Sequence, residues 1–88
     1  MGRVAAIYNL MPEGPDVVIE EVKERIPSII PDGIKVTDIQ IKPLAFGLKI
    51  LQVTFVMDDA EGMIDKLEEA LKNLEGVQSI EAISVTLI

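Results

Sequence analysis

The chain has 88 residues, a formal net charge of −7, and no Cys or His. This length makes one domain near the lower limit of independent folding. The missing residue types exclude disulfides, thiolate nucleophiles and sulfur-ligated metals, and they remove the usual general base near neutral pH. An acidic chain repels phosphate backbones and anionic membranes, so we expect neither nucleic acid nor a membrane as a direct partner.

Hydrophobic residues make up 49% of the chain and aromatic residues only 3%, which predicts an aliphatic core. The apolar runs are too short to span a bilayer, and the N-terminal stretch is too brief for a signal peptide. These features predict a cytoplasmic protein.

The first predicted elements are a strand and a helix. Residues 4–10 alternate as a strand does, with one apolar face made by Val4, Ala6, Tyr8 and Leu10. Pro15 fits the first position of the following helix, or Asp16 caps it. The apolar residues of that helix recur at helical spacing, at Val18, Val22, Ile26 and Ile29. Pro27 is expected to end or kink it.

Two strands are expected after the turn at residues 31–33. In residues 34–41 the apolar face switches between Val36 and Ile39, which indicates a bulge. Residues 47–57 form the next strand, with one face made by Leu51, Val53, Phe55 and Met57.

The last two elements are a helix and a strand. Asp58 and Glu61 are a plausible capping pair for a helix with the apolar stripe Ile64, Leu67, Leu71 and Leu74, which Gly76 would stop. Residues 77–87 form the last strand, with Ile83, Val85 and Leu87 on one face. The order βαββαβ predicts an α+β ferredoxin-like plait, a four-stranded antiparallel sheet with both helices on one face.

Asp58, Asp59 and Glu61 form the densest carboxylate cluster. They are typical either of a hard-cation site or of a first helical turn, where the helix dipole favours acids. We favour the helix turn, and we expect no metal and no cofactor.

The segment from Lys42 to Lys49 contains one of the two Phe residues at an unusual place. Pro43 interrupts strand pairing, and Phe46-Gly47 puts an aromatic ring at a tight corner. By composition alone, the ring is expected to fold back onto the edge of the core. RNA recognition would need a stacking platform, but Phe46 and Phe55 are nine residues apart and the charge has the wrong sign.

Three stretches carry a specific resemblance: PLAFGLKILQV at 43–53, DDAEGMIDKLEEAL at 58–71 and VQSIEAISV at 77–85. Together they resemble the guanine-nucleotide exchange domain of translation elongation factor 1-beta. A chain of this size is similar to the archaeal form, in which residues 1–88 would be the exchange domain alone.

The resemblance implies a function without bond chemistry. It implies that the protein promotes GDP release and GTP reloading on the GTPase elongation factor 1-alpha. In that family the aromatic residue enters a pocket of the GTPase, and the C-terminal end also faces it. The partner-binding residues implied here are Lys42, Pro43, Phe46, Gly47, Lys49, Leu87 and Ile88.

One position departs from the family pattern. Eukaryotic members have a penultimate Lys that reaches the magnesium site of the GTPase, whereas this chain has Leu87. A Leu cannot compete with Mg²⁺ by charge, so a lysine-for-magnesium mechanism does not carry over.

The alternative to an exchange factor is a small-molecule regulatory or assembly module. Two plaits would pair by their sheets, using the outer face of the third strand. That face is expected to contain Leu48, Ile50, Thr54 and Val56.

Overall fold

The computed structural model describes residues 2–14, 16–43, 47–59 and 62–88. Six regular elements follow one another along the chain. They are β1 (Arg3–Pro12), α1 (Ile19–Ile29), β2 (Ile34–Pro43), β3 (Lys49–Asp58), α2 (Met63–Lys72) and β4 (Val77–Leu87). The expected βαββαβ order is therefore confirmed.

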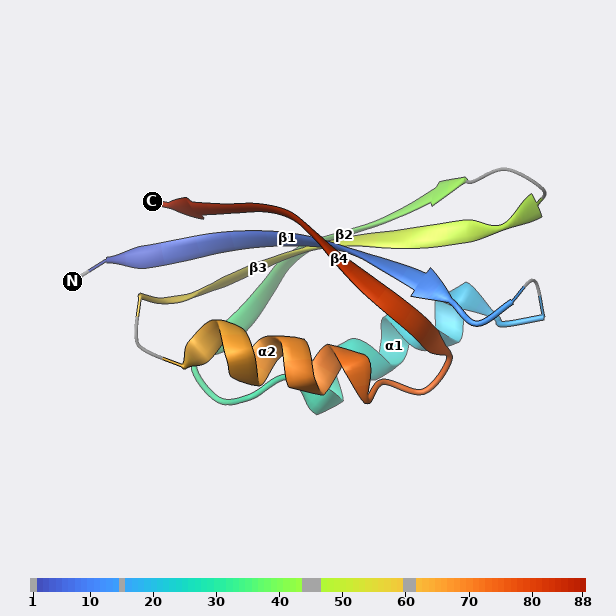
Figure 1. Ribbon diagram of the computed structural model, residues 1–88, viewed down its shortest axis with the longest axis horizontal. Coiled ribbons are helices and arrows are strands. Elements are labelled where there is room, and N and C mark those ends of the chain that lie inside the picture. The colour runs from blue at the N-terminus through green and yellow to red at the C-terminus, as the bar shows by residue number, and fades with distance from the viewer. Residues whose placement is uncertain (1, 15, 44–46, 60–61) are drawn as a thin grey trace.

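The four strands form one antiparallel sheet in the order β2-β3-β1-β4. Both helices lie on the same face of this twisted sheet, below it in the view of Figure 1. This arrangement is the predicted ferredoxin-like plait. It leaves the opposite face, here called the open face, without a covering helix, and it makes β2 and β4 the two edge strands. Neither described helix has the length and apolar character needed to cross a membrane.

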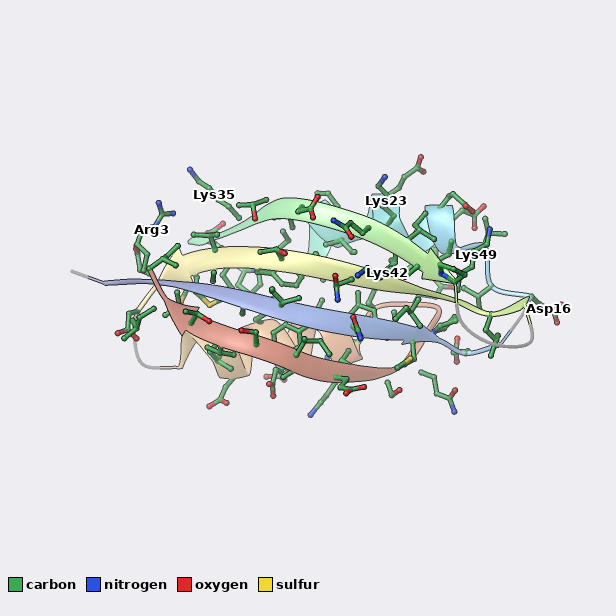
Figure 2. All side chains as sticks on the ribbon, turned by 90° about the horizontal axis from the view of Figure 1, so that it is seen from above. Arg3, Asp16, Lys23, Lys35, Lys42 and Lys49 are labelled. Carbon is green, nitrogen blue, oxygen red and sulfur yellow. The ribbon has the colours of Figure 1, made fainter. Side chains whose placement is uncertain are left out.

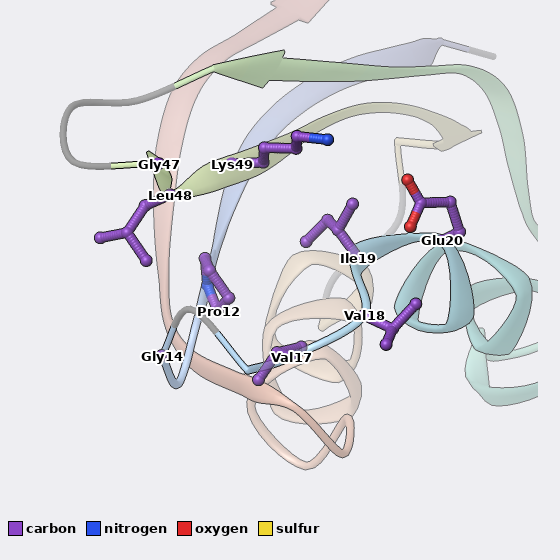
Figure 3. Close-up of a pocket in the computed structure, with 9 residues that line it drawn as sticks. All are labelled: Pro12, Gly14, Val17, Val18, Ile19, Glu20, Gly47, Leu48 and Lys49. Atoms are coloured by element: carbon purple, nitrogen blue, oxygen red, sulfur yellow. The ribbon is translucent and has the colours of Figure 1, made fainter.

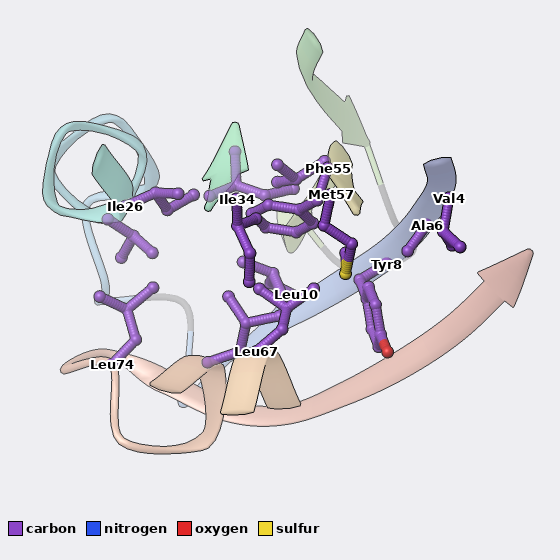
Figure 4. Packing of buried hydrophobic residues seen from close by; sticks show 14 of the residues in the cluster. Val4, Ala6, Tyr8, Leu10, Ile26, Ile34, Phe55, Met57, Leu67 and Leu74 are labelled. Carbon is purple, nitrogen blue, oxygen red and sulfur yellow. The ribbon is translucent and has the colours of Figure 1, made fainter. Parts of the chain in front are cut away.

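The core lies between the sheet and the helices (Figure 4). The alternating residues expected from the sequence fill it from the two central strands, because successive strand residues point to opposite faces. All of them are at most 7% exposed: Val4, Ala6, Tyr8, Leu10, Leu51, Val53, Phe55 and Met57. From α2, Leu67 and Leu71 are buried, and Leu74 is buried in the turn that follows.

The strand pairing contains three register shifts, and the sequence revealed only one of them. The pairing of β2 with β3 shifts between Val36 and Asp38, where a bulge was expected. The pairing of β1 with β4 shifts between Met11 and Pro12, and also between Ile7 and Tyr8, so that Ile83 has no partner in the ladder.

The shift at Ile83 interrupts the predicted apolar face of the last strand. Val85 pairs with Ala6 and Leu87 pairs with Val4, and directly paired residues share a face. Val85 and Leu87 therefore lie on the helix side of the sheet. Ile83 falls at the shift and has no partner in the ladder, so the register assigns this face to Val85 and Leu87 alone.

The start of α1 also differs from the prediction. The helix begins at Ile19, and its N-cap is Val18, which makes no side-chain cap and is 50% exposed. Asp16 is therefore not a cap, and Pro15 lies outside the described residues. The buried positions are Ile19, Val22 and Ile26 rather than a stripe through Val18, because the helix starts later and docks with a different phase.

Pro27 lies inside α1, which continues to Ile29. A proline in a helix removes the bond to the carbonyl four residues earlier. Here it occupies the last turn, so only one bond is lost shortly before the helix ends.

The ends of α2 are set by backbone conformation. The N-cap is Gly62, which has a φ of 83° and makes no side-chain cap. The prediction that Asp58 caps this helix is therefore wrong. Glu61 lies outside the described residues. The helix ends at Lys72, before Gly76, whose φ of 93° instead forms the turn into β4.

Candidate functional site: the β2–β3 hairpin and the C-terminal end

The hairpin joining β2 to β3 contains most of the predicted partner-binding residues. Phe46 is one of them and lies outside the described residues. The described residues on either side are exposed at one end of the sheet (Figure 1). They are Lys42, Pro43, Gly47 and Lys49.

Gly47 meets a backbone requirement at this hairpin. Its φ is 78°, a left-handed conformation that other residues adopt at a cost. An added Cβ would meet no atom within 4 Å, so space does not demand a glycine here. The strain of a substitution would come from the backbone alone.

Lys42 and Lys49 lie on opposite faces of the sheet. Lys42 pairs with Ile50, whereas Pro43 pairs with Lys49, and alternate residues of a strand point to opposite sides. Lys42 therefore shares the open face with Ile50, and Lys49 shares the helix side with the core residue Leu51. The two cations that bracket the hairpin in sequence do not form one positive patch.

A hollow of about 250 Å³ lies beside the hairpin (Figure 3). One wall is the start of β3, at residues 47–49. The other comes from the end of β1 and the connection to α1, at Pro12, Gly14 and residues 17–20. Most of the lining residues are apolar in type, with Glu20 and Lys49 as the charged residues, but backbone and charged groups contribute more of the exposed lining than carbon does. The hollow is thus continuous with the predicted partner-binding corner.

The hollow includes residues of α1 and its approach that the local residue pattern does not predict. Leu10 pairs with Leu51, so the end of β1 lies beside the start of β3. The βαββαβ order was the available signal, since it makes these strands antiparallel neighbours. The expected outer-face position of Leu48 also changes, because Leu48 precedes β3 and lines the hollow.

The C-terminal residues Leu87 and Ile88 are 66% and 67% exposed. The amide of Ile88 donates a hydrogen bond of 2.8 Å to the carbonyl of Arg3, which ties the chain end to β1. In Figure 1 this end and the hairpin lie at opposite ends of a molecule 43 Å long. The structure therefore does not bring the two predicted contact regions together.

The carboxylate cluster is the candidate cation site in the sequence. Asp58 and Asp59 are both exposed, and Glu61 lies outside the described residues. Among the residues that the structure describes, no three His, Cys, Asp or Glu side chains converge on a point that would hold a metal.

The described part of the core contains no buried charged side chain. Its polar group is the hydroxyl of Tyr8, which donates a hydrogen bond of 2.9 Å to Oε2 of Glu68. Burial of the ring, and then this bond and the charge of Glu68, raise the pKa of Tyr8 above its ordinary value. The Tyr8 hydroxyl therefore keeps its proton at neutral pH. Its hydrogen bond to Glu68 links β1 to α2.

The fold is shared with a solved domain of distant sequence. The C-terminal domain of the MgtC protein from Mycobacterium tuberculosis aligns with all of this chain and 88% of its own. The TM-score is 0.53 at 15% identity, a likeness that extends to the fold alone.

The fold defines a ferredoxin-like α+β domain, with exposed residues at the described base of the β2–β3 hairpin at one end of its sheet. The sequence model of the EF-1 guanine nucleotide exchange domain matches residues 5–88, so the chain belongs to that family. Curated relatives of nearly equal length agree. Proteins named elongation factor 1-beta from Methanothermobacter thermautotrophicus and Methanosphaerula palustris are each 45% identical, over 97% and 99% of this chain and 96% and 99% of their own.

Proposed function

We propose that this protein is a guanine-nucleotide exchange factor that promotes GDP release and GTP reloading on elongation factor 1-alpha. The observation that carries the proposal is the family match over residues 5–88, nearly the whole chain. The names of the full-length relatives support it. A translation factor of this kind would act in the cytoplasm and would carry out no bond chemistry of its own.

Exchange of this kind requires only differential binding. The factor must bind the nucleotide-free or Mg²⁺-free GTPase more tightly than the GDP form. By thermodynamic linkage it then weakens GDP binding by the same factor. A coupling of about 3 kcal/mol corresponds to a change of roughly 150-fold in affinity.

The hairpin is the part of the protein that we propose contacts the nucleotide-binding region of the GTPase. Phe46 would enter a pocket of the GTPase, with Pro43, Gly47 and Lys49 shaping the surface around it. Two ten-residue strands, β2 and β3, lie directly behind this corner. A contact residue supported by a rigid sheet loses little entropy on binding, which favours such an arrangement.

The C-terminal end would work differently from that of eukaryotic members. Leu87 and Ile88 offer exposed apolar surface in place of a cation. They are proposed to contact the GTPase by apolar packing, which would leave magnesium release to distortion of the nucleotide site.

The test is release of a fluorescent GDP analogue from purified elongation factor 1-alpha. Substoichiometric amounts of this protein should accelerate release, since an exchange factor turns over. An unchanged release rate at all concentrations would refute the proposal. The regulatory-module alternative would need a ligand between paired sheet faces, whereas the hollow in Figure 3 lies at the hairpin end.

A further inference from the structure

Ile50 is a buried residue on the face of the sheet that no described helix covers. It pairs with Lys42, and the two side chains lie on the open face, which Figure 2 shows from above. Only 6% of Ile50 is exposed, as little as in the core. Yet Ile50 is not one of the residues that make up the core cluster on the helix side. Its burial therefore has a separate source.

The exposure of neighbouring positions shows that this burial belongs to the hairpin end of the sheet. Alternate residues of a strand share a face, so Gln52, Thr54 and Val56 of β3 also lie on the open face. All three are half-buried, although they lie further into the sheet. Exposure should rise towards the end of a sheet, where the flanking strands stop. At Ile50 it falls instead, so a local contact covers this residue.

Strand register identifies the side chains that flank Ile50. Leu10 pairs with Leu51 at the hairpin end of the β1–β3 ladder. The next position of β1 is Met11, which alternation places on the open face together with Ile50. Met11 is half-buried and also lies outside the core cluster. From β2, Lys42 flanks Ile50 with its methylene stem, the part of a long charged side chain that can cover apolar surface.

The corner of the hairpin has few other attachments to the rest of the protein. The β1–β3 ladder ends at Leu51, so the ladder partners of Lys49 and Ile50 come from β2 alone. On the helix side, residues 47–49 border the hollow of Figure 3 instead of a packed core. Among the described residues of β3 and the hairpin, Ile50 is the buried residue nearest to the corner.

We propose that Ile50 is a positioning residue, which fixes the hairpin corner against the sheet so that Phe46 meets the GTPase in one orientation. This inference rests on the proposed function. A residue with 6% exposure offers little surface to a partner, so Ile50 acts through the corner. A contact group that is already held in place loses less entropy on binding, and a small misplacement can lower a rate by about 100-fold.

The test compares two truncations on the same strand. Ile50→Ala removes the contact at the corner, whereas Val53→Ala removes a fully buried side chain of the main core. Ile50→Val is the conservative variant, because it keeps a β-branched apolar side chain. GDP release is measured well below the thermal midpoint of every variant. NMR relaxation gives backbone order parameters for each protein without the GTPase.

We expect Ile50→Ala to lower kcat for GDP release by at least about tenfold, with KM within about twofold of the parent value, because the corner then fails in the step that expels the nucleotide. Order parameters at residues 47–49 should fall from about 0.85 towards 0.6, and those at residues 55–57 should not change. Val53→Ala should lower the thermal midpoint yet keep kcat within about twofold of the parent value. Ile50→Val should restore both kcat and the order parameters.

Equal values of kcat for Ile50→Ala and Val53→Ala would overturn the inference. A loss confined to KM would also overturn it, since Ile50 would then be a contact residue. If Ile50→Ala does not fold, Met11→Ala removes the other side of the same contact and decides by the same two measurements. Failure of the parent protein to accelerate GDP release would refute the proposed function. Unchanged order parameters at residues 47–49 would refute the positioning role by themselves, whatever the exchange activity.

Discussion

Leu87 pairs with Val4 across the β1–β4 ladder, yet Val4 is 7% exposed and Leu87 is 66% exposed. Both side chains lie on the helix side of the sheet. The difference arises because β1 is a central strand and β4 is an edge strand whose end extends past the helices. The C-terminal end is therefore an apolar surface that the protein's own core leaves uncovered.

Replacing this residue by the lysine of eukaryotic members tests the proposed apolar contact. Leu87→Lys should change the free energy of unfolding by no more than about 0.5 kcal/mol, because the side chain is exposed. It should make GDP release depend more steeply on Mg²⁺ concentration, since an ammonium group would compete with the metal ion. Val85→Lys is the matched control on the same strand and face. A magnesium dependence equal to that of the parent protein would contradict a C-terminal contact near the metal.

The two phenylalanines provide a matched pair of substitutions. Phe55 is fully buried, so Phe55→Ala should destabilise the protein by about 3–5 kcal/mol. Phe46→Ala should cost less than about 1 kcal/mol but remove most exchange activity, because an aromatic anchor in a partner pocket commonly contributes about 2 kcal/mol or more. Thermal midpoint and GDP-release rate, measured on both variants, separate the two roles. A collapsed midpoint for Phe46→Ala would make that residue part of the core.

Gly47→Ala tests the backbone requirement of the hairpin. The left-handed conformation should cost about 1–2 kcal/mol of stability and reduce exchange by displacing the corner. Gly14→Ala is the control, since Gly14 also has open space around its Cβ position but no left-handed φ. Chemical denaturation measures both variants, and equal stabilities would show that the hairpin tolerates a side chain at position 47.

The attachment of α2 to β1 through Tyr8 should depend on pH. The raised pKa means that the folded state keeps the phenol protonated after the unfolded chain begins to ionise near its ordinary pKa of 10.0. The unfolded state then binds fewer protons, so stability from this group is complete below pH 10.0 and falls as the pH rises above it. Tyr8→Phe should abolish that fall relative to the parent protein and cost about 1 kcal/mol at neutral pH. Because the chain has a single Tyr, tyrosinate absorbance in the folded protein reports the same group directly.

Association with elongation factor 1-alpha should slow as salt is added, since charges are screened beyond about 10 Å at 0.1 M ionic strength. Lys42→Ala should lower the association rate and flatten its salt dependence, because Lys42 lies on the open face beside the hairpin. Lys66→Ala makes the same change of charge at an exposed position on α2. It should alter neither the association rate nor its salt dependence. Stopped-flow measurements over a range of salt concentrations provide the comparison. An association rate independent of salt would remove electrostatic steering from the mechanism.

Local patterns in the sequence determined the strands and most of the core. The alternation of Leu51, Val53, Phe55 and Met57 predicts a strand with one buried face, and the structure buries all four. The slip between Val36 and Ile39 likewise predicts the bulge in β2. These features could be predicted because the period of a strand and the burial of one face are properties of neighbouring residues.

The helix starts and the bulge in β4 could not be predicted in the same way. Ile83, Val85 and Leu87 alternate without a break, so the register shift at Ile83 depends on pairing with β1, which the segment does not encode by itself. The start of α1 after Val18 and that of α2 after Gly62 use no side-chain cap. With no capping residue to mark them, these starts depend on how each helix docks against the sheet.

For the candidate site, the sequence by itself determined the family, predicted the hairpin residues as a contact, and placed Leu87 where the resemblance implies a lysine in eukaryotic members. Only the tertiary structure decided that Lys42 and Lys49 point to opposite faces, that the approach to α1 forms a hollow beside the hairpin, and that the C-terminal end lies at the far end of the sheet. The physical reason is that side-chain direction and distance between remote segments follow from strand register and sheet order. Both are set by contacts between residues far apart in the chain.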